Sequence, residues 1–157
     1  MSPPPPDYAD AVDAFIERAR RGELGSVTGP FEELIGYRAR FDDRHGLYLE
    51  LDVARQHLSH YGVAHGGVAL LLLDTIGGVA VFFQDRALGR ITTISLATNF
   101  VRAVEVGRVV ASARVDQLGR SVAHVSMALR AGSPDGELLA TGLAAYRLFR
   151  QPPQGGS

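Results

Sequence analysis

Two groups that could do chemistry lie close together near the middle of the chain. A His65-Gly66-Gly67 triplet stands before an apolar run over residues 68–83, and Asp74 lies inside that run. The run is too long for an ordinary strand and begins with strong helix formers, so it predicts one buried helix that starts at the glycines. The N–H groups at a helix start have no partner within the helix, and glycine has no side chain to block a ligand. Such a group can bind an oxygen that gains negative charge, which is the requirement of an oxyanion site.

Asp74 is of interest because a carboxylate amid leucine, isoleucine and valine side chains is costly to bury without a purpose or a partner. It lies two turns after Gly67 on nearly the same helix face, at roughly 10 Å by the helix rise. Groups that act on one carbonyl must all lie within about 3 Å of the reacting atoms. Either only one of the two acts, or the site combines the helix start of one chain with the Asp74 of another. We favour the second option, which predicts a dimer.

Each of these residues also has a purely structural interpretation. Two glycines before a helix are often only a turn, and a lone aspartate on an apolar helix can be a hydrogen-bonded core residue. His57, His60 and His65 are close in sequence and could bind zinc if the loop folded back, but their spacing matches no common metal motif. We therefore expect no metal site, and we expect His65 to cap or brace the helix start.

Composition narrows the class of protein. The chain has 157 residues, enough for one domain with a sizeable core, a net charge of −1 and no cysteine. The balanced charge gives no reason to expect nucleic acid or a membrane surface as partner, and the lack of cysteine excludes disulfides and thiol catalysis. No secretory signal is visible, so the cytoplasm is the expected location. The apolar run is short for a membrane span and contains Asp74, so no transmembrane segment is expected.

The elements that would position these groups follow from periodicity and turn signals. Residues 1–7 form a proline-rich tail that we expect to be disordered or extended, and 150–157 a polar tail, which leaves 8–149 as a single domain. The expected elements are a helix over 8–21, a loop over 23–33, strands over 34–42 and 47–53, a polar loop over 55–64, the long helix, and strands over 91–101, 106–115, 121–131 and 137–149. The first two strands should pair as a hairpin. A helix followed by a strand meander implies an α+β fold with a mainly antiparallel sheet.

A further motif lies in the strand after the long helix, where residues 93–102 begin with threonine and end in Asn-Phe-Val-Arg. Together with the triplet at 65–67 and Asp74 nine positions after its histidine, this motif resembles hotdog-fold acyl-CoA thioesterases of the phenylacetate-pathway (PaaI-like) group. In that group a His-Gly-Gly motif opens the central helix, and the strand ends in Asn-Phe-x-Arg-Pro. The final proline is absent here. The resemblance extends from about residue 46 to 149.

The resemblance implies a hotdog fold, in which an antiparallel β-sheet wraps around a long central α-helix, and a homodimer or homotetramer built from sheets joined edge to edge. It also implies active sites that take the helix start from one subunit and the acid from the other. The Gly67 N–H, beside Gly66 and His65, would polarise the thioester carbonyl. Asp74 would act as general base on water or as nucleophile, and Thr93 would position the water or the carboxylate.

Other site residues are carried over from the same resemblance. Arg102 and Arg120 are candidates for the coenzyme A phosphates, because guanidinium groups suit phosphate oxygens, and Asn99 and Ser121 are candidates beside them. Ser59 stands where the family often has asparagine, six residues before the motif histidine, and offers a hydroxyl in place of an amide.

The expected function is hydrolysis of an acyl-CoA thioester to free acid and coenzyme A, with no cofactor, since coenzyme A is part of the substrate. The alternatives are a non-catalytic acyl-CoA-binding hotdog protein and a hotdog dehydratase. The acyl group, the choice between dimer and tetramer, and the choice between base and nucleophile for Asp74 stay open.

Overall fold

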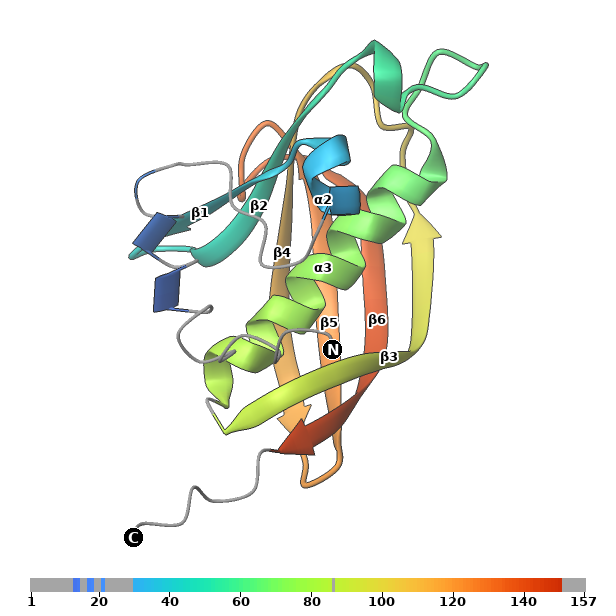
Figure 1. Cartoon of the computed structure of the whole chain (residues 1–157). Helices are drawn as coiled ribbons and strands as arrows, with labels where there is room; N and C mark the ends of the chain where they lie inside the picture. The colour runs from blue at the N-terminus through green and yellow to red at the C-terminus, as the bar shows by residue number, and fades with distance from the viewer. Residues whose placement is uncertain (1–12, 15–16, 19–20, 22–29, 86, 151–157) are drawn as a thin grey trace, which may run out of the picture.

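The computed structural model describes residues 13–14, 17–18, 21, 30–85 and 87–150. Within these, one long helix lies across a strongly curved sheet (Figure 1). The elements in chain order are α2 (Pro30–Ile35), β1 (Arg38–Asp42), β2 (Gly46–Val53), the 3₁₀ turn η1 (Arg55–His57), α3 (Gly66–Gln84), β3 (Leu88–Phe100), β4 (Gly107–Leu118), β5 (Val122–Ala131) and β6 (Leu138–Arg150).

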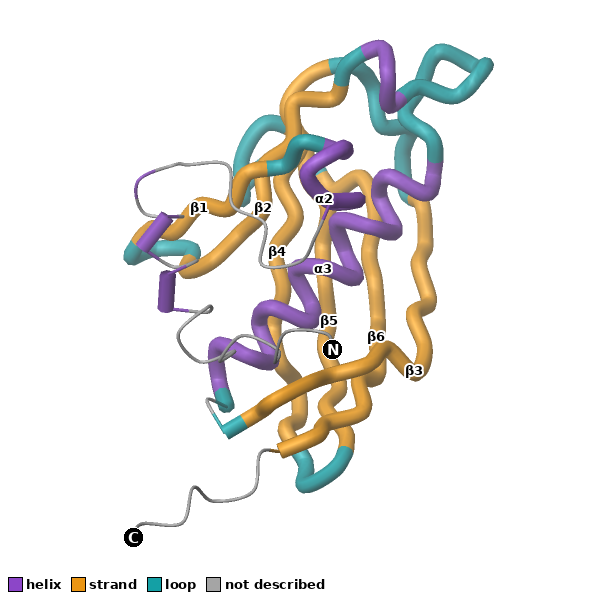
Figure 2. Tube along the Cα trace, in the orientation of Figure 1, coloured by secondary structure: helices purple, strands orange, loops and turns teal. Residues whose placement is uncertain are grey.

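The six strands form one sheet in the order β1-β2-β4-β5-β6-β3, and every neighbouring pair is antiparallel. The hairpin of β1 and β2 is therefore present as predicted, and the later strands form a meander in which β3 returns to the far edge. Figure 2 shows the sheet curling around α3, with β3 crossing beside the helix. The predicted antiparallel α+β arrangement, with a sheet wrapped around the long helix, is confirmed.

The core lies between α3 and the concave face of the sheet. Leu72, Leu73 and Ile76 repeat at helical spacing and are at most 1% exposed, which makes this the face that packs on the strands. Opposite them lie side chains of the central strands, among them Val125 and Tyr146, both 1% exposed. By length and hydropathy α3 could cross a membrane, but half of its apolar window is buried against the fold. Its apolar composition is accounted for by its place in the core.

The segment before β1 differs from the sequence prediction. Residues 30–35 form helix α2, and the first strand begins only at Arg38, whereas a loop to residue 33 and a strand from 34 were predicted. Pro30 occupies the first helical position, where its fixed φ favours a helix and its missing N–H costs nothing. Gly36 follows the helix with φ +83°, a conformation that few other residues adopt.

Other predicted boundaries hold to within a few residues. Of the helix predicted over 8–21, residues 13–14, 17–18 and 21 are described and helical, and the rest lies outside the described residues. The predicted tail over 1–7 and the tail after residue 150 lie outside them too, and residue 150 itself ends β6. The long helix begins at Gly66, so both glycines of the triplet belong to its first turn.

Candidate active site

The start of α3 is capped by His65, as the sequence predicts. The His65 Nδ1 accepts a hydrogen bond of 3.0 Å from the Gly67 N–H, and the His65 carbonyl accepts one of 2.9 Å from the Val68 N–H. The His65 ring therefore acts as the N-cap of the helix, a role that Ser, Thr, Asp or Asn has at most helix starts. Within the described part of the chain the Gly66 N–H has no hydrogen-bond partner. The unused donor at this helix start is that of Gly66 and not that of Gly67.

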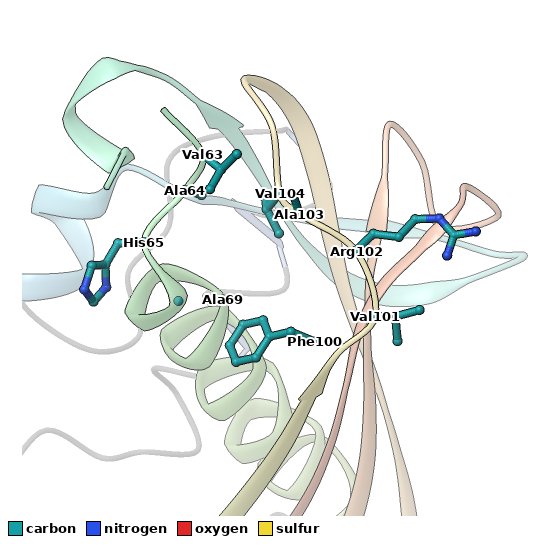
Figure 3. Close-up of a pocket in the computed structure, with 10 residues that line it drawn as sticks. Val63, Ala64, His65, Ala69, Phe100, Val101, Arg102, Ala103 and Val104 are labelled. Carbon is teal, nitrogen blue, oxygen red and sulfur yellow. The ribbon is translucent and has the colours of Figure 1, made fainter. Parts of the chain in front are cut away.

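A pocket of about 390 Å³ lies beside this helix start. It is enclosed by the chain leading into α3 and by the loop between β3 and β4, which are joined by a 2.7 Å hydrogen bond from the Ala64 N–H to the Val104 carbonyl. In Figure 3 the Phe100 ring lies beside the first turns of α3, while the Arg102 side chain extends away from it. A Cβ added at Gly66 would lie 3.3 Å from Phe100 Cζ, so the ring packs directly on the glycine. The free N–H thus belongs to a residue that lines a largely apolar pocket.

Asp74 lies half-buried in the middle of α3 and is held by two hydroxyl groups. Thr93 Oγ1 donates a hydrogen bond of 2.9 Å to Asp74 Oδ1. The Tyr146 hydroxyl lies 2.9 Å from the Asp74 backbone oxygen and 3.3 Å from Oδ1. The predicted contact between Thr93 and the acid is therefore present in the structure. Tyr146 was not predicted, because a tyrosine in a strand 72 residues away carries no local signal of such a contact.

Tyr146 is buried, and this controls its hydrogen bonding. Burial, followed by the negative charge of Asp74, raises the pKa of the Tyr146 phenol well above its ordinary value. The hydroxyl therefore stays protonated and acts as a donor toward the aspartate.

Gly77 makes the approach of Tyr146 to α3 possible. A Cβ added at Gly77 would overlap the Tyr146 hydroxyl and would lie 2.7 Å from Met127 Sδ. Any larger residue would push the phenol away from the helix backbone. The glycine one turn after Asp74 is therefore part of the arrangement that holds the acid.

Strand β3 carries a bulge next to this contact. The pairing of β3 with β6 shifts register between Thr93 and Ser95, which leaves Ile94 unpaired and 57% exposed. Bulges bend a strand and re-aim its side chains, and they are common beside active sites. Here the bulge lies immediately after the residue whose hydroxyl reaches Asp74.

The two groups of chemical interest lie apart within one chain. Gly66 and Asp74 are separated by eight positions on one continuous helix, which corresponds to about 12 Å. The pocket adjoins Gly66, whereas Thr93 and Tyr146 gather around Asp74. Within one chain the two groups therefore lie too far apart to act on one carbonyl, as the distance argument from the sequence predicts.

The remaining predicted residues make no hydrogen bond to Gly66 or to the Asp74 carboxylate within the described part of the chain, although Arg102 lines the pocket. Ser59 Oγ donates to the Val63 carbonyl at 3.0 Å and accepts from the Tyr61 N–H at 3.3 Å, so it braces the loop before the triplet. Asn99 is exposed on β3. Arg102 lines the pocket but pairs with Glu137 at 2.6 Å.

Arg120 and Ser121 lie in the turn between β4 and β5, at the opposite end of the sheet from Arg102 (Figure 1). The twelve residues of β4 separate the two ends by roughly 35–40 Å. The predicted pair of phosphate-binding arginines is therefore not brought together within one chain.

The three histidines around the triplet have separate roles. His57 is buried, accepts from the Ala54 N–H at Nδ1 and places Nε2 2.9 Å from the Ile35 carbonyl. This assigns the proton to Nε2 and ties η1 to the end of α2. The His60 ring lies against the Tyr61 ring, with centroids 3.8 Å apart and the planes tilted by 40°. No group of three potential metal ligands occurs in the described part of the chain.

Comparison with known proteins places these features in a family. The pattern of the family described as "Thioesterase superfamily" matches residues 61–137, which include the triplet, Asp74 and Thr93. "Putative esterase TV1331" of Thermoplasma volcanium is 30% identical over 99 residues, covering 61% of this chain and 71% of that protein. "Putative esterase Rv1847" of Mycobacterium tuberculosis is 30% identical over 98 residues, covering 60% and 70%.

Solved structures agree with this assignment. The structure of Rv1847/MT1895 from Mycobacterium tuberculosis superimposes with a TM-score of 0.71 at 24% identity, covering 80% of this chain and all of that one. A "putative thioesterase, phenylacetic acid degradation-related protein" from Ralstonia eutropha JMP134 gives 0.68 at 25% identity, covering 85% and 98%. The chain described above is a hotdog-fold protein of the thioesterase superfamily.

Proposed function

We propose that this protein is a PaaI-like acyl-CoA thioesterase, which hydrolyses an acyl-CoA thioester to a free acid and coenzyme A. The observation that carries the proposal is the hydrogen bonding of Asp74. This acid lies in the middle of the core helix, and the Thr93 hydroxyl orients its carboxylate. The unpaired Gly66 N–H beside a pocket supplies the complementary group. A family whose members are named thioesterases and esterases supports the class of reaction.

The proposed chemistry divides between these two groups. The Gly66 N–H donates to the thioester carbonyl oxygen and stabilises the negative charge that forms there. Asp74 takes a proton from a water molecule, whose oxygen bonds to the carbonyl carbon; the carbon–sulfur bond then breaks and coenzyme A leaves as the thiol once it gains a proton. Direct attack by the carboxylate is the alternative, with water then hydrolysing the acyl-enzyme anhydride. In both cases Gly66 replaces Gly67 as the proposed donor, because His65 engages Gly67.

The proposed active form is a homodimer or a homotetramer. Gly66 and Asp74 of one chain are too far apart to act on one carbonyl. Strand β3 is a thirteen-residue edge strand with no second neighbour in the sheet, and its residues 92–95 are exposed. An edge of this length is suited to pairing with another strand. Pairing through β3 would put Thr93 and Asp74 beside the interface, where the helix start of a second chain can meet them.

The proposed substrate contacts are those of the coenzyme A moiety. Arg102 lies at the pocket and is paired with Glu137, and it would leave this ion pair to bind a phosphate of coenzyme A. Breaking the pair would cost little free energy, because exposed ion pairs are weak. Arg120 and Ser121 lie at the other end of the sheet and can reach the same substrate only from a second subunit, whereas Asn99 lies near the end of β3, three residues before Arg102. We propose no cofactor, no nucleic-acid partner and no membrane association, and a cytoplasmic location.

The experiment that tests the proposal is thiol release from short, long and aromatic acyl-CoA thioesters by the wild type and by Asp74→Asn. We expect turnover of some thioester by the wild type and a loss of at least about a hundredfold in the variant, within the range for a general acid–base group. Asparagine keeps the size of the side chain, so the loss would report the lost basicity. Binding of coenzyme A esters without thiol release would favour a binding protein, and loss of water from a hydroxyacyl-CoA without thiol release would favour a dehydratase.

A further inference from the structure

We infer that Tyr146 is a positioning residue for Asp74, which, together with Thr93, holds carboxylate oxygen Oδ1 so that Oδ2 is the oxygen that acts on the substrate. The inference rests on the proposed function and deepens it, because it assigns the reactive atom of the acid. It also names a residue whose only contact with the reaction is through Asp74.

The two oxygens of the Asp74 carboxylate differ in their hydrogen bonding. Both side-chain donors reach Oδ1, Thr93 at 2.9 Å and Tyr146 at 3.3 Å. Within the described residues no hydrogen bond reaches Oδ2. Two donors on one oxygen restrict rotation of the carboxylate about its last bond, since turning it would exchange the two oxygens and break both contacts. The unengaged oxygen is then presented in one direction.

Tyr146 is itself held on several sides. Its side chain is 1% exposed, its hydroxyl lies 4.0 Å from Met127 Sδ, and its ring packs where Gly77 leaves room on α3. The same hydroxyl lies 2.9 Å from the Asp74 backbone oxygen. It therefore contacts both the main chain and the side chain of one residue. A rigid, buried phenol of this kind couples the position of the acid to strand β6.

The protonation state of Tyr146 fits this role. Burial and the neighbouring negative charge both raise the pKa of the phenol, so it remains a donor throughout the neutral range. Loss of the hydroxyl should therefore lower kcat while KM stays near its wild-type value, because Asp74 loses a donor that orients it and the substrate keeps its own contacts.

The kinetic test compares Tyr146→Phe with Tyr37→Phe. Phenylalanine keeps the ring against Gly77 and removes only the hydroxyl, and Tyr37 is a second buried tyrosine, placed just before β1. For Tyr146→Phe we expect kcat to fall about tenfold with KM within about twofold of wild type. Tyr37→Phe should change neither kcat nor KM, and equal kcat values for both variants and the wild type would overturn the inference.

A second measurement does not depend on turnover. With ¹³Cζ-labelled tyrosine, the five tyrosines give separate signals, and the Tyr146→Phe spectrum assigns the one of interest. We expect the Tyr146 signal to move in Asp74→Asn, where the charged oxygen beside the hydroxyl is replaced, and the other four tyrosine signals to keep their positions. A Tyr146 signal at the same position in both proteins would overturn the contact. A clear displacement in a protein that releases no thiol from any thioester would refute the proposed function and leave the contact standing.

Discussion

The Thr93 hydroxyl donates a 2.9 Å hydrogen bond to Asp74 Oδ1, and this contact joins the edge strand of the sheet to the middle of the core helix. Replacing Thr93 with valine keeps the branched shape and removes the donor. We expect Thr93→Val to lose about tenfold in kcat, since a hydrogen bond to a charged group contributes roughly 1.5–3 kcal/mol. Thr93→Ser should keep most of the activity, because its hydroxyl can make the same contact.

Thr92 provides the matched control for that substitution, because successive side chains of a strand point to opposite faces. Thr92→Val should leave the rate of thiol release within about twofold of wild type. A Thr93→Val protein as active as Thr92→Val would mean that the hydroxyl has no part in catalysis.

Gly66 allows the removal of a single backbone N–H with little damage to the fold. Proline is favoured at the first position of a helix, and His65 before it has φ −62° and ψ 136°, the extended conformation that a residue before proline prefers. We expect Gly66→Pro to fold and to lose about 10²–10³ in kcat, the usual effect of losing one oxyanion donor.

Gly66→Ala is the control for the added bulk, because it introduces the same Cβ near Phe100 and keeps the N–H. It should retain most of the kcat of the wild type. If the proline variant worked as fast as the alanine variant, the donor would have to be another group.

The proposed sharing of a site between subunits predicts complementation. Asp74→Asn and Gly66→Pro should each be inactive, but co-expressed chains form mixed dimers in which one site carries both substitutions and the other carries neither. Each mixed dimer then has one intact site of two, so about half of wild-type activity should return in the mixed dimers. The measurement is thiol release by mixed dimers purified through two different tags. Mixed dimers with no recovered activity would place both groups in the site of one chain.

Gly77 should be intolerant of even the smallest side chain. An alanine in a helix interior normally adds roughly 0.5–1 kcal/mol of stability relative to glycine, but here the Cβ would overlap the Tyr146 hydroxyl and press on Met127. We expect Gly77→Ala to destabilise the fold by about 1–3 kcal/mol, the usual cost of overpacking, measured by urea unfolding.

Gly78→Ala is the neighbouring control, since the one close contact of its Cβ would be the flexible end of Ile91 at 3.0 Å. The Cβ would also lie 3.9 Å from Tyr146 Cε1, an ordinary van der Waals contact, so Gly78→Ala should be close to neutral. Equal stability of the two alanine variants would contradict the close packing of Tyr146 on Gly77.

His45 predicts a pH-dependent contribution to stability outside the site. Its ring lies 3.0 Å from Asp42 and 3.0 Å from Asp135, so it ties the β1–β2 turn to the β5–β6 turn. The ring hydrogen bonds raise the pKa of His45 and lower that of Asp135. The pKa of Asp42 is lowered first by the His45 backbone N–H and then by the ring. Because the pKa of His45 is raised in the folded state, the protonated ring stabilises the fold fully at pH values below the ordinary histidine pKa of about 6.5. This contribution is lost as the pH rises through the raised pKa of the folded state. Because the pKa values of Asp42 and Asp135 are lowered, their charged carboxylates stabilise the fold above pH values of about 3.9, the ordinary aspartate pKa. This contribution is lost as the pH falls through the lowered pKa values.

These two pH limits define the range in which the His45 ring stabilises the fold. We expect the wild type to exceed His45→Gln in melting temperature most clearly near pH 5–6, and the difference to shrink as the pH rises past neutrality. Thermal melts of both proteins across pH 5–9 measure this. A difference that stays constant over the whole range would mean that the ring acts by packing alone.

Much of the fold followed from local patterns. The apolar run over 68–83 was long enough to be only a helix, and the turn residues between apolar segments marked the strands of a meander. The helix over 30–35 was missed because its six residues contain too little periodicity to distinguish them from a loop. What makes it a helix is Pro30 at its start and Gly36 after its end, two signals that are weak without the tertiary structure.

The sequence by itself determined the central helix with Asp74 inside it, the antiparallel sheet and the capping role of His65, because each depends on neighbouring residues and on local hydrophobic patterns. The tertiary structure alone decided which helix-start N–H stays free, since that depends on the orientation of the His65 ring. It alone brought Tyr146 to Asp74, a contact between residues 72 positions apart that only the curl of the sheet around α3 and the missing side chain of Gly77 allow. Contacts of this kind depend on packing, and packing is a property of the folded chain that no local pattern encodes.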